Sequence, residues 1–565
     1  MSRFQKLAIL IRLVWKKFTK VEKIVAIILV AAIFFSAISL GQDFYYLGAR
    51  IIPQDGGVLI EGIVGQPKVI NPVLAKTEAD KIATSLIFAP LLSRNEKNEP
   101  IPVLAEKWNL SPDKLDYTIN LRKNLLWHDG APFGADDIVY TIAVVQNPDY
   151  QDTATKAAWE GVRVDKIDDS TVNFHLSSPY ASFLNALAIN IIPRHIWVDV
   201  PVKDFAKSPY SLNPVGLGAY KLGKITQDKE GKINLIKLSA HDGFVLGRPH
   251  LKTIDLKFYS DKESLLKGFV DREFTSFGTY SFDGKQAARN TRGYTKHDVF
   301  LPQYVGAFFN LKRVTPLTDA SVRQALAYAT DKNRLNKEVN FGAGVSISSP
   351  ILPGYLGYDD TVKNYNYDKK NAQAILSQAG WTDQDNDGIR EKEGQKLSFI
   401  LAMPDEPQFD RLITELSRQW QEMGVSLNIQ KAPSNSFEEK FLVGRDYDIV
   451  LIGENIGADP DPYSYWHSSQ AFYPGLNLSL WENGEADQLL QEARQINDAN
   501  VKIRDYKKFQ DIFAAELPAI LFYQPTYVYK AYKGMKGIDL SGISMPSERF
   551  YNIFNWYVKY ERARK

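Results

Sequence analysis

An uninterrupted run of seventeen uncharged, mostly apolar residues near the N-terminus divides this chain into two unequal parts. Residues 24–40 read IVAIILVAAIFFSAISL, and the run ends at Gly41-Gln42-Asp43. A helix rises about 1.5 Å per residue, so this run just reaches the length needed to cross a bilayer. The sequence therefore predicts one N-terminal transmembrane helix, with the remaining residues folded on one side of the membrane.

The charges that flank this run predict its orientation. Residues 1–23 carry seven basic groups and a single acid, Glu22. Basic flanks stay in the cytoplasm, so we expect a cytoplasmic head at 1–23 and an extracytoplasmic body. The alternative is a signal peptide cleaved after Ser39, where Ala37 supplies the second small residue. The head is long and carries an apolar stripe of its own, which favours a retained signal anchor.

The composition of the body excludes several classes of function. Of the 68 basic and 66 acidic residues, 61 and 65 lie outside the head, which gives no electrostatic basis for binding nucleic acid. There is no cysteine, so disulfides and thiolate metal sites are excluded. The seven histidines show no paired spacing, and no nucleophile elbow or P-loop appears. We therefore expect a protein that is not an enzyme and has no cofactor and no metal.

The segment from Leu104 to Val145 predicts a strand, a turn and a helix in succession. Apolar and polar residues alternate over 117–121, which is typical of a half-buried strand. A turn at 129–130 follows, and a helix is expected to begin at Ala135 with carboxylates in its first turn. The neighbouring acids Asp136-Asp137 do not face each other across a substrate bond, so capping is their expected role.

Several strings in the body, taken in order, carry a resemblance. They are LAEKW at 104–108, HDGAPFGADD at 128–137, NPVGLGAY at 213–220 and VRQALAYATD at 322–331. Together they resemble the family 5 extracellular solute-binding proteins, the peptide- and nickel-binding subunits of ABC importers. Gly134, Leu217 and Ala219 depart from the family pattern. The resemblance extends over about residues 57–560.

The resemblance implies an α/β fold with two lobes. This is the type II periplasmic-binding-protein-like fold of the large peptide-binding class, with an extra subdomain in lobe one. After the helix and a tether at 41–56, lobe one is expected at 57–306 and 526–560, and lobe two at 307–525. Ligand would bind between the lobes and draw them closed.

The resemblance also implies a ligand site in the loop GADPDPYSYWH at 457–467. In peptide-binding members, a carboxylate of this loop pairs with the α-ammonium group of the ligand, a role for Asp459 or Asp461. Tyr463 or Trp466 would line a side-chain pocket, and Asn71 would lie at the edge of the cleft. The alternative is a proline-stiffened turn whose Asp side chains cap backbone N–H groups.

A second polar loop imitates a calcium site. Residues 383–388 read DQDNDG and place acids at positions 1, 3 and 5 of the pattern. Position 12 is Gly394 where a bidentate Glu is required. A solvated turn is therefore the expected structure.

The predicted function is that of a monomeric, membrane-anchored binding protein on the extracytoplasmic side of the cell membrane. It would capture oligopeptides and deliver them to ABC transporter permease subunits. A nickel chelate, haem or an oligosaccharide is the alternative ligand. A membrane-tethered ligand sensor and an extracytoplasmic hydrolase are the alternatives from other classes.

Overall fold

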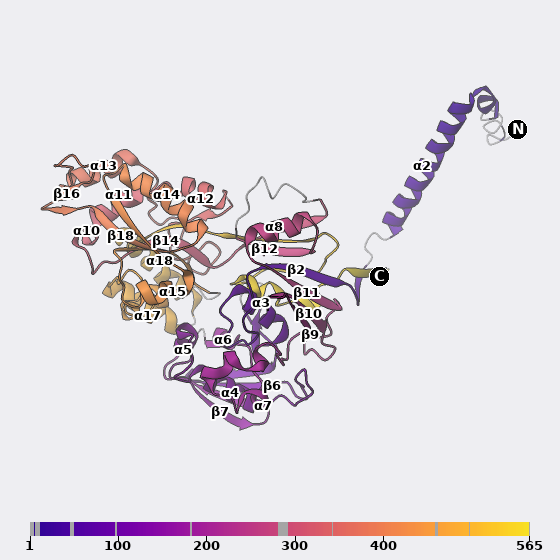
Figure 1. Ribbon diagram of the computed structural model, residues 1–565, viewed down its shortest axis with the longest axis horizontal. Coiled ribbons are helices and arrows are strands. Elements are labelled where there is room, and N and C mark those ends of the chain that lie inside the picture. The colour runs from indigo at the N-terminus through magenta and orange to yellow at the C-terminus, as the bar shows by residue number, and fades with distance from the viewer. Residues whose placement is uncertain are drawn as a thin grey trace. The chain divides into compact units, whose positions relative to one another are not determined.

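The computed structural model contains two compact units (Figure 1). One comprises residues 1–56 with 557–565, and the other comprises residues 57–556. The residues that the structure describes are 5, 12–45, 50–95, 99–180, 183–280, 292–341, 343–457, 461–496 and 498–563.

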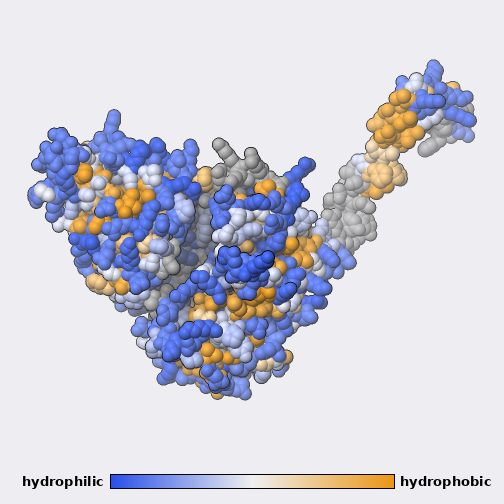
Figure 2. Space-filling view, viewed as in Figure 1, coloured by the Kyte–Doolittle hydropathy of each residue, from blue (hydrophilic) through white to orange (hydrophobic). Residues whose placement is uncertain are grey.

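The first unit contains the predicted membrane helix. Helix α2 runs from Lys20 to Tyr45 and begins with a capping box between Thr19 and Glu22. None of the residues 20–38 is buried, and the helix is long and apolar enough to cross a membrane. Figure 2 shows apolar side chains gathered along it.

A two-stranded sheet completes the first unit. Strand β1 (Arg50–Gln54) pairs antiparallel with β23 (Lys559–Ala563), with Arg50 opposite Ala563. Residues 50–54 lie within the predicted tether at 41–56. They form a strand because the partner comes from the other end of the chain, where sequence proximity gives no indication of pairing.

A seven-stranded mixed sheet forms the centre of the first lobe. Strand β2 runs parallel to β11, and the strand order is β13-β22-β12-β2-β11-β10-β9. Residues 526–532, predicted to return to this lobe, form β22 between β13 and β12. The strands are β2 (Val58–Val64), β9 (Tyr220–Gln227), β10 (Ile233–Ala240), β11 (Thr253–Tyr259), β12 (Ser276–Thr279), β13 (Tyr294–Phe300) and β22 (Thr526–Tyr532).

A buried ion pair links this sheet to the short 3-10 helix Pro546–Phe550. Glu61 on β2 is fully buried, and Arg549 is 2% exposed. Glu61 Oε1 accepts hydrogen bonds from Arg549 Nη2 at 2.8 Å and Nε at 3.1 Å. The other carboxylate oxygen accepts from the Tyr529 hydroxyl at 3.0 Å and from Ser276 Oγ. Every side-chain oxygen of Glu61 is therefore satisfied, as a buried charge requires.

A separate four-stranded antiparallel sheet is the extra subdomain of this lobe. Its order is β5-β6-β8-β7, and helix α4 (Ala135–Val145) packs on β7 and β8. The predicted alternation over 117–121 is confirmed, because Tyr117, Ile119 and Leu121 are at most 3% exposed. The strands are β5 (Ala105–Leu110), β6 (Asp116–Leu121), β7 (Arg163–Asp168) and β8 (Thr171–His175).

Asp137 organises the start of α4. Its Oδ2 accepts from the Gly134 backbone N–H at 3.0 Å and from Trp127 Nε1 at 3.3 Å. Its Oδ1 accepts from the Arg194 backbone N–H at 2.9 Å. Because Asp137 is 6% exposed and engaged by three donors, the prediction that this acid caps backbone groups is confirmed.

The glycines of the string at 213–220 are required by close packing. A Cβ at Gly216 would lie 1.9 Å from the carbonyl oxygen of Ile87, and one at Gly218 would lie 2.5 Å from the carbonyl carbon of the same residue. Ile87 ends helix α3 (Glu78–Ile87), and its oxygen accepts from Gly218 N–H at 2.7 Å. Because neither glycine has a side chain, the backbone of this loop can contact the backbone at the end of α3 directly.

The second lobe is an α/β layer structure built on a six-stranded sheet. On one face of this sheet, helices α11 (Ala320–Ala329), α13 (Lys369–Gln378) and α14 (Pro407–Gln421) pack with Ile449 and Leu451 of strand β20 (Ile449–Asn455). On the other face, α17 (Gly484–Gln495) and α18 (Ala499–Glu516) pack with Val450. Successive side chains of a strand point to opposite faces, so β20 is apolar on both sides. Figure 1 shows these helices around β14 and β18. The strand order is β15-β21-β14-β20-β18-β19.

The bounds of the elements in this lobe and of the remaining short elements are as follows. The strands are β15 (Val345–Ser346), β21 (Ala519–Gln524), β14 (Gln303–Phe309), β20 (Ile449–Asn455), β18 (Ser398–Pro404), β19 (Ser426–Ala432), β16 (Glu391–Lys392), β17 (Gln395–Lys396), β3 (Leu92–Arg94) and β4 (Pro100–Pro102). The helices are α11 (Ala320–Ala329), α13 (Lys369–Gln378), α14 (Pro407–Gln421), α17 (Gly484–Gln495), α18 (Ala499–Glu516), α5 (Thr153–Ala158), α6 (Phe183–Ala186), α7 (Arg194–Trp197), α8 (Lys262–Val270), α10 (Thr315–Thr318), α12 (Lys332–Asn340), α15 (Ser434–Phe437) and α16 (Tyr463–Trp466).

Candidate ligand-binding site

The predicted ligand loop connects β20 to the short helix α16. Asp459 lies outside the described residues, so its predicted role stays a prediction. Asp461 is described and is largely buried, with 10% of its side chain exposed. Its Oδ1 accepts from the Tyr463 backbone N–H at 3.1 Å, and its Oδ2 lies 3.3 Å from Arg494 Nε. Asp461 is thus already engaged by a backbone donor and a cation.

Arg494 forms the centre of a stack that joins the two lobes. Its guanidinium carbon lies 4.5 Å from the ring centroid of Tyr180 and 4.4 Å from that of Tyr463. Tyr180 follows the four-stranded sheet of the first lobe, whereas Arg494 lies on α17 of the second. Tyr463 in turn stacks on His467 at 4.1 Å. The cation therefore bridges the lobes directly beside the predicted loop.

Trp466 lies in the core of the second lobe. It is 1% exposed and packs against Phe308 at 5.8 Å and Phe513 at 4.8 Å between ring centroids. Trp466 is thus part of the hydrophobic core directly behind the predicted loop, and its place in a side-chain pocket stays a prediction. Tyr463 is half-buried within the stack and keeps a place at the junction of the lobes.

Asn71 is also fully buried. Its Oδ1 accepts from the Val73 backbone N–H at 3.0 Å and so caps the turn that follows. That turn forms one wall of a cavity of about 200 Å³ whose other walls include Tyr150 and Asn190. The structure therefore places Asn71 behind a cavity wall of the first lobe, where its side chain supports the turn.

Glu454 is a buried acid near the end of β20. It is 8% exposed, and among the described residues its Oε2 has no hydrogen-bond partner. Burial raises the pKa of Glu454 to about 8, so the side chain is neutral near pH 7. The next residue, Asn455, accepts from the Tyr465 hydroxyl at 2.7 Å, which ties the strand end to α16.

The raised pKa of Glu454 makes stability depend on pH. Above about pH 4.5 the unfolded chain releases this proton while the folded chain keeps it. The contribution of Glu454 to the free energy of unfolding therefore falls between pH 4.5 and 8, and it is constant at higher pH. Glu454→Gln is expected to raise the midpoint of thermal unfolding at pH 9 and to leave it almost unchanged at pH 5. Unfolding followed by circular dichroism at both pH values checks this, and an equal change at both would contradict it.

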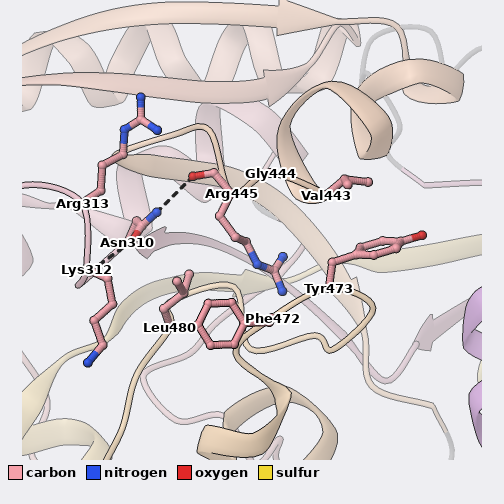
Figure 3. Close-up of a pocket in the computed structure, with 9 residues that line it drawn as sticks. All are labelled: Asn310, Lys312, Arg313, Val443, Gly444, Arg445, Phe472, Tyr473 and Leu480. Atoms are coloured by element: carbon pink, nitrogen blue, oxygen red, sulfur yellow. Dashed lines mark hydrogen bonds between the residues drawn. The ribbon is translucent and has the colours of Figure 1, made fainter.

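A different cavity lies at the opposite end of the second sheet. It measures about 500 Å³, and Figure 3 shows its lining residues, Asn310, Lys312, Arg313, Val443, Gly444, Arg445, Phe472, Tyr473 and Leu480. Asn310 follows the end of β14, whereas Gln303 at the start of that strand pairs with Asn455.

The cations of this cavity already have structural partners. Lys312 pairs with Glu482 at 2.8 Å, and Arg313 pairs with Asp448 at 3.1 Å. Arg445 Nη2 donates to the Gly475 carbonyl at 2.6 Å. We assign no ligand to this cavity.

Comparison with known sequences decides the family. A profile described as bacterial extracellular solute-binding proteins, family 5 middle region, matches residues 99–473. The chain belongs to the family 5 bacterial extracellular solute-binding proteins. The loop after β20 and the four-stranded subdomain both lie within the matched residues of this solute-binding protein.

Individual relatives cover nearly the whole solute-binding protein. The oligopeptide-binding protein AppA of Bacillus subtilis is 28% identical over 542 residues, which is 94% of this chain and 98% of AppA. The structure of AppA with a nonapeptide has a TM-score of 0.75 at 27% identity and covers 90% of this chain and 100% of that one. NikZ of Campylobacter jejuni, solved with Ni(L-His), has a TM-score of 0.72 at 27% identity with the same coverage. The fold is thus the type II periplasmic-binding-protein fold.

Three residues of this site, Tyr180, Arg494 and Glu454, are not among the residues that the sequence predicts for it. Tyr180 stands in a Pro-Tyr string, Arg494 lies on an ordinary amphipathic helix, and Glu454 falls beyond the predicted strand end at 452. A carboxylate two residues beyond a predicted strand that ends in the apolar residues 449–452 is a signal that the sequence carries for Glu454. Arg494 has no comparable signal, because its partners Asp461, Tyr463 and Tyr180 all lie more than 30 residues away in sequence.

Proposed function

We propose that this solute-binding protein captures oligopeptides between its two lobes and delivers them to the permease subunits of an ABC importer. The observation that carries the proposal is the Tyr180–Arg494–Tyr463 stack, which bridges the lobes beside the loop after β20. A bridge there is suited to a site that closes around its ligand. The near full-length similarity to an oligopeptide-binding protein supports a peptide as that ligand.

We infer that Asp459, and not Asp461, pairs with the α-ammonium group of the peptide. Asp461 already accepts from the Tyr463 N–H at 3.1 Å and pairs with Arg494 at 3.3 Å. A carboxylate compensated in this way attracts a second cation weakly. Asp459 is the other carboxylate of the same Asp-Pro-Asp-Pro string. In this proposal, Asp461 holds Arg494 in place and Asp459 binds the ligand.

Removal of the Arg494 cation is expected to weaken ligand binding. A cation between two aromatic rings contributes about 0.5–2 kcal/mol, so Arg494→Gln should weaken peptide affinity about 2- to 30-fold. Titration calorimetry with a peptide pool checks this result. Arg163→Gln is the matched control, because Arg163 lies on β7, is 68% exposed and pairs with Asp165, which is itself 44% exposed. Equal affinities of Arg494→Gln and the unmodified protein would contradict the bridge.

Native mass spectrometry of the full chain in detergent tests the proposed function. Purification from a peptide-rich host is expected to yield one 63.9 kDa chain carrying masses spread over short peptides. A single discrete non-peptide mass would overturn the peptide assignment, and turnover of added peptides would overturn the binding-only function.

We further propose that α2 stays attached and anchors the protein in the cell membrane, with the body on the extracytoplasmic side. The exposed apolar surface of α2 and the basic groups before it support this arrangement. N-terminal sequencing of the mature protein tests it. A mature N-terminus near residue 40 would show that the helix is cleaved.

A further inference from the structure

Three carboxylates of the second lobe converge in the loop between α13 and β16. Asp383, Asp385 and Glu391 each place a carboxylate oxygen within 4.8 Å of the others. Asp383 and Asp385 are exposed, whereas Glu391 is 8% exposed. Three acids at this separation repel one another unless a cation lies among them.

Glu391 is the unusual member of this group. Its Oε1 accepts from the Gln384 backbone N–H at 2.6 Å. Its Oε2 is buried and has no hydrogen-bond partner in the part of the chain that the structure describes. An unpaired buried carboxylate oxygen costs free energy, and a bound cation removes that cost. The buried oxygen therefore points to a ligand, independently of the acidic loop.

The loop holds Glu391 in a fixed position. The backbone N–H of Glu391 donates to the Thr382 carbonyl at 2.8 Å, and the Thr382 N–H donates back at 3.2 Å. The adjacent Arg390 donates to the Met423 carbonyl at 3.0 Å and to the Trp381 carbonyl at 2.7 Å. These contacts fix both ends of the loop, so the carboxylates converge on a rigid base.

We propose that Asp383, Asp385 and Glu391 bind a calcium ion, with Asp387 and water completing the oxygen shell. Calcium accepts six to eight oxygen ligands in irregular geometry, and this group offers only oxygen ligands. The sequence pattern expects its last carboxylate at position 12, where Gly394 stands. The bridge between Thr382 and Glu391 instead brings in a carboxylate at position 9.

Lys396 is the competitor for this site. Its ammonium group lies 2.7 Å from Asp385 Oδ2 and also pairs with Asp387. The side chain is 39% exposed and belongs to β17, so it can swing into solvent when calcium binds. Lys396 thus supplies the positive charge in the structure described, and calcium would displace it.

Calorimetric titration of the EDTA-treated full chain in detergent tests the site. We expect one calcium ion per chain with a Kd of about 10⁻⁴–10⁻³ M, the range of extracellular calcium modules. Magnesium should bind at least about tenfold more weakly, because it demands near-octahedral geometry. Glu391→Gln should weaken calcium binding at least about tenfold, as expected when a buried charged ligand is lost. Glu393→Gln, which alters an exposed acid of the same hairpin, should leave it within about twofold.

A second variant keeps the test decisive if Glu391→Gln does not fold. Lys396→Gln removes the competing ammonium group and should tighten calcium binding about fivefold, as expected for an exposed ion pair. If the loop is only a solvated turn, neither the unmodified protein nor Lys396→Gln binds calcium. Absence of binding at 10 mM calcium (about tenfold above the expected Kd) in both proteins would overturn the proposal, as would equal losses in Glu391→Gln and Glu393→Gln.

Discussion

Replacement of Arg549 by methionine is expected to lower the free energy of unfolding by about 3–5 kcal/mol. Arg549 is 2% exposed and donates two hydrogen bonds to Glu61, so its loss leaves a buried carboxylate without its cation. Urea denaturation followed by tryptophan fluorescence measures the change. This is among the largest effects that a single side chain can have on a folded protein.

Two further variants distinguish the loss of the buried charge pair from the loss of an arginine side chain as such. Arg418→Met removes an arginine of α14 that is 44% exposed, and its partner Glu415 keeps a second cation in Arg334, so the loss should be less than about 1 kcal/mol. The double variant Glu61→Leu with Arg549→Met should be much closer in stability to the unmodified protein, because neither buried charge remains. A loss in Arg549→Met no greater than that in Arg418→Met would contradict the role of the pair.

Asp459→Asn is expected to weaken the binding of peptides with a free N-terminus about 10- to 150-fold. The variant loses a charge-assisted contact worth about 1.5–3 kcal/mol. Peptides with an acetylated N-terminus lack the ammonium group, so their affinity should be the same for the variant and the unmodified protein. Calorimetry with matched free and acetylated peptides measures both affinities.

Asp461→Asn provides the contrast for this experiment. Because Asp461 pairs with Arg494, its loss should weaken free and acetylated peptides by the same factor. If Asp459→Asn also weakened both peptides equally, Asp459 would not be the ammonium partner. If Asp461→Asn were selective for free peptides, the two roles would be exchanged.

Local patterns predicted the elements that depend on neighbouring residues. The strand at 117–121 and the helix that begins at Ala135 have the predicted faces and start, because alternation and capping act within a few residues. The two-lobed fold was predicted from the order of the family-like sequence strings, and not from the periodicity of apolar residues. The pairing of β1 with β23 was missed, because the partners lie about 500 residues apart.

The candidate site was harder to predict because long-range contacts decide the state of each side chain. The sequence offers Asp461 and Trp466 as free groups of a polar loop. The fold places Arg494 against the first and buries the second against Phe308 and Phe513. Glu391 was overlooked for the same reason, since its place among the aspartates depends on a hairpin register.

The ladder between Arg50–Gln54 and Lys559–Ala563 also imposes an order on the maturation of the chain. Strand β1 leaves the ribosome early, and its partner leaves about 500 residues later. At roughly 5–20 residues per second, β1 waits about half a minute to two minutes for that partner. Until then residues 50–54 have no partner strand. The ladder therefore forms only in chains synthesised as far as residues 559–563, and chains that stop earlier lack it.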